Sequence, residues 1–300
     1  MSDSIIVKFV DLEGIERTES VERNTSRIIL SNIGLTEIDL DSLSECPRLK
    51  VLNLSHNQLK QVDLRPLSNC ESLRELHLSS NQLNEIDLTP LTGVPLAELW
   101  LEHNRFSTID LTPLSNSDTL CLLLLHDNRL ASIDLTPLSM CKILDTLHLQ
   151  RNILTHLDLG PLSTCTKLTD VDLDENKLIE LNLEPFSTNT NLVNLILNGN
   201  DLSAIDLDPL SGCRNLMNLW LYDNQLTELD ISPISKLSNL MTLYLHNNPL
   251  SVFDITSLID RESGFDLTLD KSVKLTTQDS SDSDFISSVM EKFKENIRFM

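Results

Sequence analysis

A regular pattern of leucines recurs along most of the chain. It has the form L-x-x-L-x-L-x-x-N-x-L and continues as x-x-I-D-L-x-P-L-S-x-C. Ten copies follow one another at a spacing of 24 residues, with one copy of 23, and a well-preserved copy begins at Leu49 and reaches Cys70. Repetition at a fixed period of this length indicates a stack of similar coils.

Each copy predicts one short strand and one return segment. In the second copy Leu52 and Leu54 alternate with polar or outward residues, and we expect them to point into the core. Val51, Asn53 and Ser55 then point outward, because successive side chains of a strand lie on opposite faces. A single coil cannot bury its own apolar stripe, so the coils must stack and their strands must form a parallel sheet.

An asparagine and a proline mark the two turns of each copy. The asparagine amide can donate and accept hydrogen bonds, so we expect it to satisfy the buried backbone where the chain leaves the strand, as a structural residue. Proline fixes φ and lacks an N–H, which predicts a short 3₁₀ or irregular turn in the return segment. The asparagines are Asn57, Asn81, Asn104, Asn128, Asn152, Asn176, Asn200, Asn224 and Asn248, and the prolines are Pro66, Pro90, Pro113, Pro137, Pro161, Pro185, Pro209 and Pro233.

An aspartate precedes each return turn and forms a column of like charges. One interpretation is a cap, in which each carboxylate accepts an N–H of the turn that follows it. The other is a ladder of Ca²⁺ sites, for which the oxygen-rich loop is missing. Asn182 replaces the aspartate in the seventh copy and favours the cap, since an amide oxygen accepts the same bond. The column comprises Asp39, Asp63, Asp87, Asp110, Asp134, Asp158, Asp206, Asp230 and Asp254.

These motifs resemble the leucine-rich repeat superfamily in its common 24-residue form, over residues 25 to about 270. The resemblance implies an α/β leucine-rich-repeat solenoid. Its curved parallel β-sheet lies on the concave face, and short 3₁₀ or irregular turns lie on the convex face. The family binds through its variable positions, so the shared frame specifies architecture rather than function.

The repeats divide the chain into four parts. Residues 1–24 read as an N-terminal cap built from a strand or hairpin, and residues 25–260 hold the ten repeats. Residues 261–277 read as a degenerate C-terminal repeat or cap, and residues 278–300 as an acidic linker and a C-terminal amphipathic helix. The helix either caps the solenoid or recruits a partner. Its apolar residues at helical spacing are Phe285, Ile286, Val289, Met290, Phe293 and Ile297.

The net charge of −22, from 23 basic and 45 acidic residues, excludes classes of partner. It opposes nucleic acid and anionic membrane surfaces, which are bound through Lys and Arg, and suits a protein partner with a basic patch. The start of the chain lacks the pattern of a signal peptide, and no apolar stretch is long enough to span a membrane. We therefore expect a cytoplasmic monomer.

The cysteines agree with a reducing compartment. Five of the six occupy one position of the repeat, where two other copies carry Val94 and Leu237, so that position is an apolar core position. We expect buried, reduced thiols rather than disulfides, and the Cys and His spacing of a zinc site is missing. The five are Cys46, Cys70, Cys141, Cys165 and Cys213.

Tryptophan, tyrosine and histidine gather at the outward strand positions. Ten of these eleven rings stand at the fifth, seventh or eighth position of a copy, and such rings are enriched at interface hot spots. One predicted patch holds Trp100, His77, Leu124 and His148, with Glu102, His103 and His126 beside it. A second holds Trp220, Tyr222, Tyr244 and His246, and the acidic block Asp170, Asp172, Asp174 and Glu175 lies between the two along the chain.

These patches predict a non-enzymatic module that binds a protein on its concave sheet. No nucleophile elbow, phosphate loop, CxxC or HExxH motif occurs. Two alternatives are a regulatory subunit or scaffold for a phosphatase or small GTPase, as similar intracellular family members are, and a self-associating structural repeat protein. Strands about 4.7–4.9 Å apart could let Glu102, His103 and His126 share a metal ion. No ligand spacing specifies that ion, and we expect neither metal nor cofactor.

Overall fold

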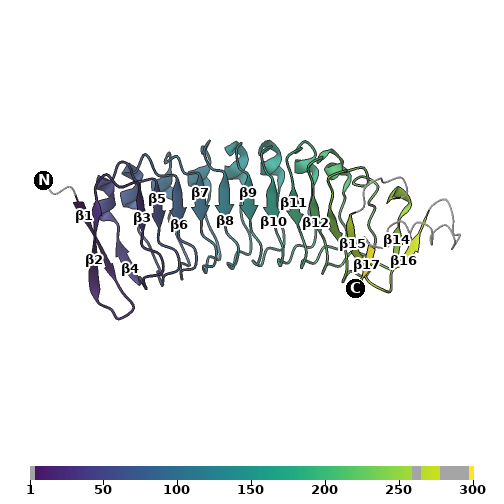
Figure 1. Cartoon of the computed structure of the whole chain (residues 1–300), viewed down its shortest axis with the longest axis horizontal. Coiled ribbons are helices and arrows are strands. Elements are labelled where there is room, and N and C mark those ends of the chain that lie inside the picture. Colours follow the sequence, from purple (N-terminus) through teal and green to yellow (C-terminus); the bar gives the residue numbers. More distant parts are fainter. Residues whose placement is uncertain (1–3, 259–264, 278–296) are drawn as a thin grey trace. The chain divides into compact units, whose positions relative to one another are not determined.

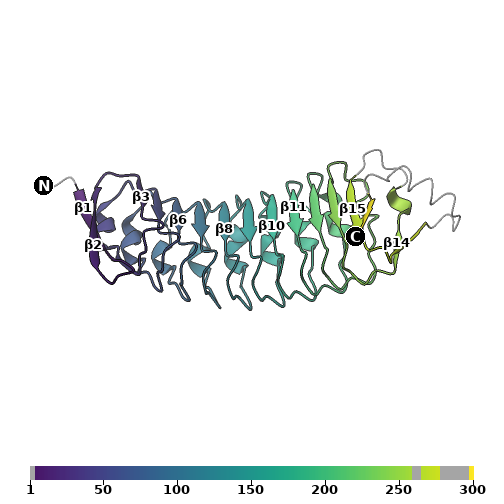
Figure 2. The ribbon, with the colours of Figure 1, turned by 60° about the horizontal axis from the view of Figure 1, so that its bottom comes forward.

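The computed structural model describes residues 4–258, 265–277 and 297–300 (Figures 1 and 2). It contains two compact units, Met1–Ile153 and Leu154–Met300. Within the described ranges every helix is a short 3₁₀ turn, and none has the length and apolar character needed to cross a membrane.

The first unit begins with an antiparallel sheet. Strand β1 (Ser4–Val10) pairs with β2 (Glu16–Glu22) on one side and with β4 (Glu37–Asp39) on the other. The repeats that follow contribute a parallel sheet of β3 (Arg27–Ile29), β5 (Val51–Asn53), β6 (Glu75–His77), β7 (Glu98–Trp100), β8 (Leu122–Leu124) and β9 (Thr146–His148). Their return segments are η1 (Asp41–Glu45), η2 (Arg65–Asn69), η3 (Thr89–Leu91), η4 (Thr112–Leu114) and η5 (Thr136–Met140).

The second unit repeats the same plan. Its parallel sheet consists of β10 (Asp170–Asp172), β11 (Asn194–Ile196), β12 (Asn218–Trp220), β13 (Thr242–Tyr244), β15 (Asp266–Leu269) and β17 (Ile297–Phe299). A separate parallel pair joins β14 (Val252–Asp254) to β16 (Lys274–Thr276). The return segments are η6 (Gly160–Thr164), η7 (Glu184–Phe186), η8 (Asp208–Gly212) and η9 (Thr256–Leu258).

Alternation along the strands separates the core from the outward face, with two departures. Leu52 and Leu54 are fully buried, as predicted. Val51 and Ser55, which the alternation places outward, are nevertheless only 4% and 6% exposed. Neighbouring strands lie about 4.8 Å apart, so small side chains at outward positions are covered by the longer side chains beside them.

The asparagines that recur at the turn of each repeat form a ladder of hydrogen bonds between coils. Asn104 Oδ1 accepts the N–H of Leu83 at 3.0 Å, and its Nδ2 donates to the carbonyls of Leu78 at 3.0 Å and Leu101 at 3.1 Å. Two of these three partners belong to the preceding coil, so each amide closes its own turn and ties it to its neighbour. All nine asparagines are buried and make bonds of this kind, which confirms their structural role.

The aspartate column caps the return turns. Asp110 Oδ1 accepts the N–H of Thr112 at 2.8 Å, and hydrogen bonds from Thr112 hold the pKa of this carboxyl below its ordinary value. Asn182 accepts the equivalent bond from Glu184 at 2.9 Å. The same bond recurs after each aspartate of the column, which confirms the cap interpretation.

Seven of the eight prolines stand in a 3₁₀ turn, η2 to η8. Pro233 instead lies in a hydrogen-bonded turn over residues 232–236, the irregular alternative that its sequence also allowed. The helix expected over residues 285–297 falls almost wholly outside the described residues. Its last residue, Ile297, contradicts that expectation, because it opens strand β17 and is buried against the end of the parallel sheet.

The five repeat cysteines are fully buried and all six cysteines are free thiols. Burial raises the pKa of the Cys70 and Cys213 thiols to about 11. Cys70 donates to the carbonyl of Leu43 at 3.5 Å, and Cys213 to that of Phe186 at 3.4 Å, so each thiol contacts the coil before it. Cys121 differs, because it lies outside this position and is only half-buried.

We expect Asn104→Ala to lower the midpoint of urea unfolding clearly. The change leaves a buried N–H and two carbonyls without their partner, and a single unsatisfied buried group costs about 1–3 kcal/mol. Asn84→Ala is the matched control, since Asn84 is exposed in the preceding coil. Equal unfolding midpoints for the two variants would contradict the structural role of the ladder.

We expect a thiol reagent to modify Cys121 before the five buried cysteines of the native protein. Buried thiols are inaccessible to the reagent, whereas Cys121 is half-buried. The pKa of about 11 for Cys70 and Cys213 also leaves little reactive thiolate on them at pH 8. Mass spectrometry of timed, quenched samples measures the order of labelling, with urea-denatured protein as the control in which all six react promptly. Disulfides, or simultaneous native labelling of all six, would show the interpretation to be wrong.

Candidate functional site

The outward sheet face is built from the third, fifth and seventh positions of each repeat. Strand register places equal positions of neighbouring coils side by side, as in the pairs His77–Trp100 and Trp220–Tyr244. The eighth position has positive φ at every non-glycine copy, including His103 (54°) and Asp127 (52°). This left-handed residue turns the chain out of the strand, so side chains at the eighth position stand at the rim of the face.

Four rings of the second unit form two stacked pairs, here called the Trp220 cluster: Trp220, Tyr222, Tyr244 and His246. The ring centroids of Trp220 and Tyr244 lie 5.5 Å apart, with 22° between the planes. Those of Tyr222 and His246 lie 4.7 Å apart and nearly parallel, at 6°. All four rings are half-buried. One edge or face of each ring therefore remains available to a ligand.

A chain of hydrogen bonds at the third position supports this cluster. Trp220 Nε1 donates to Thr242 Oγ1 at 2.9 Å, and Thr242 Oγ1 donates to Asn218 Oδ1 at 2.7 Å. Asn218 in turn donates to Asn194 Oδ1 at 2.7 Å, and Asn194 to Asp170 Oδ2 at 3.3 Å. The chain crosses four coils and ends on a carboxylate, so the indole is held in one orientation.

Carboxylates surround Tyr222. Burial raises the pKa of its hydroxyl, and the charges of nearby acidic side chains raise it further. These side chains are Asp174, Asp223, Glu175 and Asp172, in order of decreasing effect. The predicted acidic block therefore lies beside the Trp220 cluster within the second unit and gives that part of the face a negative potential.

The first unit carries a smaller ring pair. His77 stacks on Trp100, with centroids 4.3 Å apart and planes 20° apart. Trp100 Nε1 donates to Glu98 Oε2 at 3.0 Å, and His77 Nε2 lies 3.7 Å from Glu75 Oε2. Leu124, in the same column, is only 9% exposed and offers little surface to a partner.

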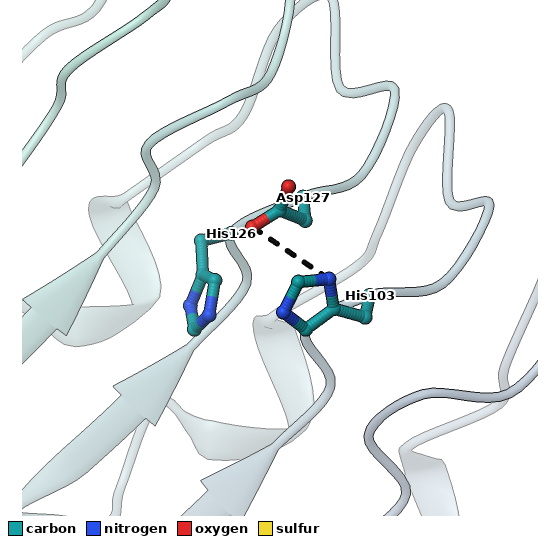
Figure 3. A group of neighbouring side chains, drawn as sticks. All are labelled: His103, His126 and Asp127. Carbon is teal, nitrogen blue, oxygen red and sulfur yellow. Dashed lines mark ion pairs between the residues drawn. The ribbon is translucent and has the colours of Figure 1, made fainter. Parts of the chain in front are cut away.

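Three histidines and an aspartate form a second group in this unit. Figure 3 shows His103, His126 and Asp127 of this group. The ring of His126 contacts those of His103 and His148 edge to face, at centroid distances of 5.2 and 6.0 Å. Asp127 Oδ2 lies 3.7 Å from His103 Nδ1 and 3.8 Å from Arg151 Nη1. Burial lowers the pKa of His126 to about 4, so this ring is neutral at pH 7.

The sequence interpretation located the outward rings but missed their supports. Glu75, Glu98, Asn194, Asn218 and Thr242 all stand at the third position, which the same strand alternation places outward. These polar residues carry no ring and lie outside the fifth, seventh and eighth positions, so the search for rings did not identify them. Asp127 and Arg151 stand at the eighth position but carry no ring, and only the structure shows that Asp127 lies near both His103 and Arg151.

Comparison with known proteins agrees with this architecture. Two family models match the chain: the leucine rich repeat at residues 23–83, and the BspA type leucine rich repeat region, in six copies, at residues 123–241. No protein of curated function matches the sequence.

Solved leucine-rich repeat structures superimpose on most of the chain. An internalin, InlF, from Listeria monocytogenes is 22% identical with a TM-score of 0.63, over 86% of this chain and 85% of its own. A leucine-rich repeat protein from Leptospira interrogans is 20% identical with a TM-score of 0.52, over 86% and 80%.

The ectodomain of the plant membrane receptor kinase GASSHO1/SCHENGEN3 from Arabidopsis thaliana is 25% identical with a TM-score of 0.72. The match covers 88% of this chain and 34% of the ectodomain, which was solved in complex with Casparian strip integrity factor 2. The repeat frame, its matching family models and these shared folds lead to one conclusion. The chain belongs to the leucine-rich repeat proteins, whose members are typically non-enzymatic modules of protein–protein interaction.

Proposed function

We propose that this protein binds a protein partner on the outward face of its parallel sheet, with the Trp220 cluster as the anchor. The observation that carries the proposal is the pair of ring stacks, Trp220 on Tyr244 and Tyr222 on His246, in neighbouring coils of a rigid sheet. Rings that combine an apolar body with a polar tip dominate the energetics of protein interfaces.

The cluster is ordered before any partner arrives. Trp220 Nε1 is held by Thr242, and His246 Nδ1 lies 2.7 Å from Thr268 Oγ1. Binding must otherwise immobilise such side chains at a cost of about 0.5–1.5 kcal/mol each. Because these side chains are already fixed in the folded protein, binding need not immobilise them at that cost. This favours the cluster as a binding site over an equally exposed but mobile patch.

The acidic side chains beside the cluster favour a partner with a basic patch. Asp172, Asp174 and Asp223 lie close enough to Tyr222 to raise its pKa. An Arg or Lys of the partner could pair with these carboxylates while contacting a ring face. The net charge of −22 adds a long-range attraction for such a partner.

A structural relative supports the choice of function. The Arabidopsis ectodomain, with the same fold and 25% identity over the matched region, was solved as a complex with Casparian strip integrity factor 2. By analogy we infer a binding role for this chain, with a partner of its own. We further infer that the free protein is a monomer and resides in the cytoplasm, where its six free thiols would stay reduced.

We expect Trp220→Ala to weaken partner binding about thirtyfold or more, since truncating an interface hot spot costs about 2 kcal/mol or more. Affinity purification from source cells with the wild-type chain identifies the partner. Titration calorimetry with the purified partner then compares the wild type, Trp220→Ala and Tyr244→Ala.

The matched control is Thr112→Ala with Thr136→Ala, two exposed positions in return segments on the opposite side of the coils. Circular dichroism verifies that each variant is folded. If the control weakens binding as much as Trp220→Ala does, the return side is the interface and the proposal is wrong.

We expect Asp172→Asn with Asp174→Asn to act mainly on the association rate. Charges beside an interface steer encounter, so their removal should slow association and flatten its dependence on salt, with a smaller change in dissociation. Surface plasmon resonance at several salt concentrations measures both rates. An unchanged salt dependence would show that these carboxylates do not steer the partner.

A further inference from the structure

Buried polar atoms without a hydrogen bond concentrate at one place in the first unit. Among the described residues these atoms include Glu102 Oε2, His126 Nδ1, Asp127 Oδ2 and Gln150 Oε1. All four residues stand at the seventh or eighth position of three successive coils. Buried polar atoms are normally paired, so a group of such atoms on one patch requires an explanation.

These atoms share one chemical property. The two carboxylate oxygens and the amide oxygen can only accept, and a neutral imidazole nitrogen can offer a lone pair. A cluster of lone pairs with few protons to share is stabilised by a cation. Nitrogen together with carboxylate ligands favours a transition-metal ion such as Zn²⁺ over Ca²⁺ or Mg²⁺, which prefer oxygen alone.

The geometry identifies three ligands. One donor atom each of His103, His126 and Asp127 lie within 4.8 Å of one another (Figure 3). The His103 N–H also donates to the carbonyl of His126 at 3.0 Å, which holds the two coils in register at the site. In a tetrahedral zinc site the ligand atoms lie about 3.3–3.5 Å apart, given metal–ligand distances of about 2.0–2.2 Å.

Side-chain rotations would have to bring the three donor atoms closer together to reach that geometry. His103 Nδ1 and Asp127 Oδ2 are 3.7 Å apart, and the His103 side chain is 50% exposed and able to turn. We propose that His103, His126 and Asp127 bind one divalent transition-metal ion of the zinc class at the rim of the outward face. Three protein ligands leave a fourth tetrahedral position for water or for a side chain of a partner.

Two neighbouring side chains affect cation binding at this site, Glu102 favourably and Arg151 unfavourably. The acidic side chain of Glu102 is 7% exposed and directly precedes His103 in the chain, where it would favour a bound cation. Arg151 opposes the ion, because its guanidinium lies 3.8 Å from the Asp127 oxygen that would bind it.

A second group of possible ligands, Glu75, His77 and Glu98, is less suitable. The oxygen Glu98 Oε2 already accepts the indole N–H of Trp100 at 3.0 Å, and the His77 ring is stacked on Trp100. A metal ion bound by this oxygen would have to displace the indole N–H. At the proposed site, the buried atoms of Glu102, His126 and Asp127 have no hydrogen bond to lose.

The test is a Zn²⁺ titration by calorimetry of the metal-stripped, tag-free full chain. A Cys121→Ser background removes the thiol that is not buried. We expect one Zn²⁺ per chain, and an intense visible absorption when Co²⁺ is added instead, as tetrahedral sites give. His103→Ala and His126→Ala should each weaken Zn²⁺ binding at least about tenfold, since even residues that support a metal ligand contribute that much.

Two further variants separate a metal site from a general effect of histidine or charge. His156→Ala removes an exposed histidine of the second unit and should leave binding unchanged. Arg151→Gln should lower the Kd, because it removes the opposing charge. His103 is half exposed, so His103→Ala is expected to fold even if His126→Ala does not, and circular dichroism verifies both.

The proposal is overturned if no Zn²⁺ binds, or if folded His103→Ala binds as the wild type does. It is also overturned if His77→Ala abolishes binding, which would place the ion at the other group. Partner binding through the Trp220 cluster is measured separately, so failure of either proposal leaves the other to its own test.

Discussion

The buried turn at the end of each strand is the constraint on which the rest of the structure depends. Its backbone N–H and carbonyl groups lie away from water and must be paired inside the protein. One asparagine amide per coil does this, and Asn104 shows how, with one bond inside its own coil and two to the preceding one. Since the same amide serves the turn and the stack, coils can add to one another only in one register.

That register determines what the outward face can do. Because equal positions of neighbouring strands lie side by side, a ring at the fifth position in two successive copies becomes a stacked pair, as Trp220 and Tyr244 do. Polar residues at the third position become a continuous hydrogen-bonded chain from Thr242 to Asp170. Substitutions that leave the frame untouched can therefore build a new surface without a new fold.

The side chains at the rim are positioned by a different constraint, the backbone conformation of the eighth residue of each repeat. The residue before each asparagine adopts a left-handed conformation, although it is glycine in only one copy, Gly199. Such a conformation is uncommon for other residues and persists because the ladder holds the turn on both sides. It brings the eighth-position side chains of successive coils together, so that Asp127 lies between His103 and Arg151. The proposed metal site depends on this geometry, because two of its three ligands, His103 and Asp127, stand at the eighth position.

The repeat frame could be read from the sequence because its interactions are periodic. Asn104 and Asp110 bond to partners at constant offsets, so one copy predicts the rest, and the same holds for the buried column of Cys70. The positions of the candidate rings on the outward face followed from strand alternation in the same way.

The tertiary structure alone decided what each side chain contacts. Leu124 and Val51 occupy outward positions yet are buried. The strand register places longer side chains on both sides of each, Trp100 and His148 beside Leu124, and Arg27 and Glu75 beside Val51. Ile297 fits a helical pattern but pairs with the end of the sheet, where the unpaired edge of β15 outweighs local preference. The meeting of His103, His126 and Asp127 likewise depends on the rotamers of two coils at once, and no spacing within a single copy encodes it.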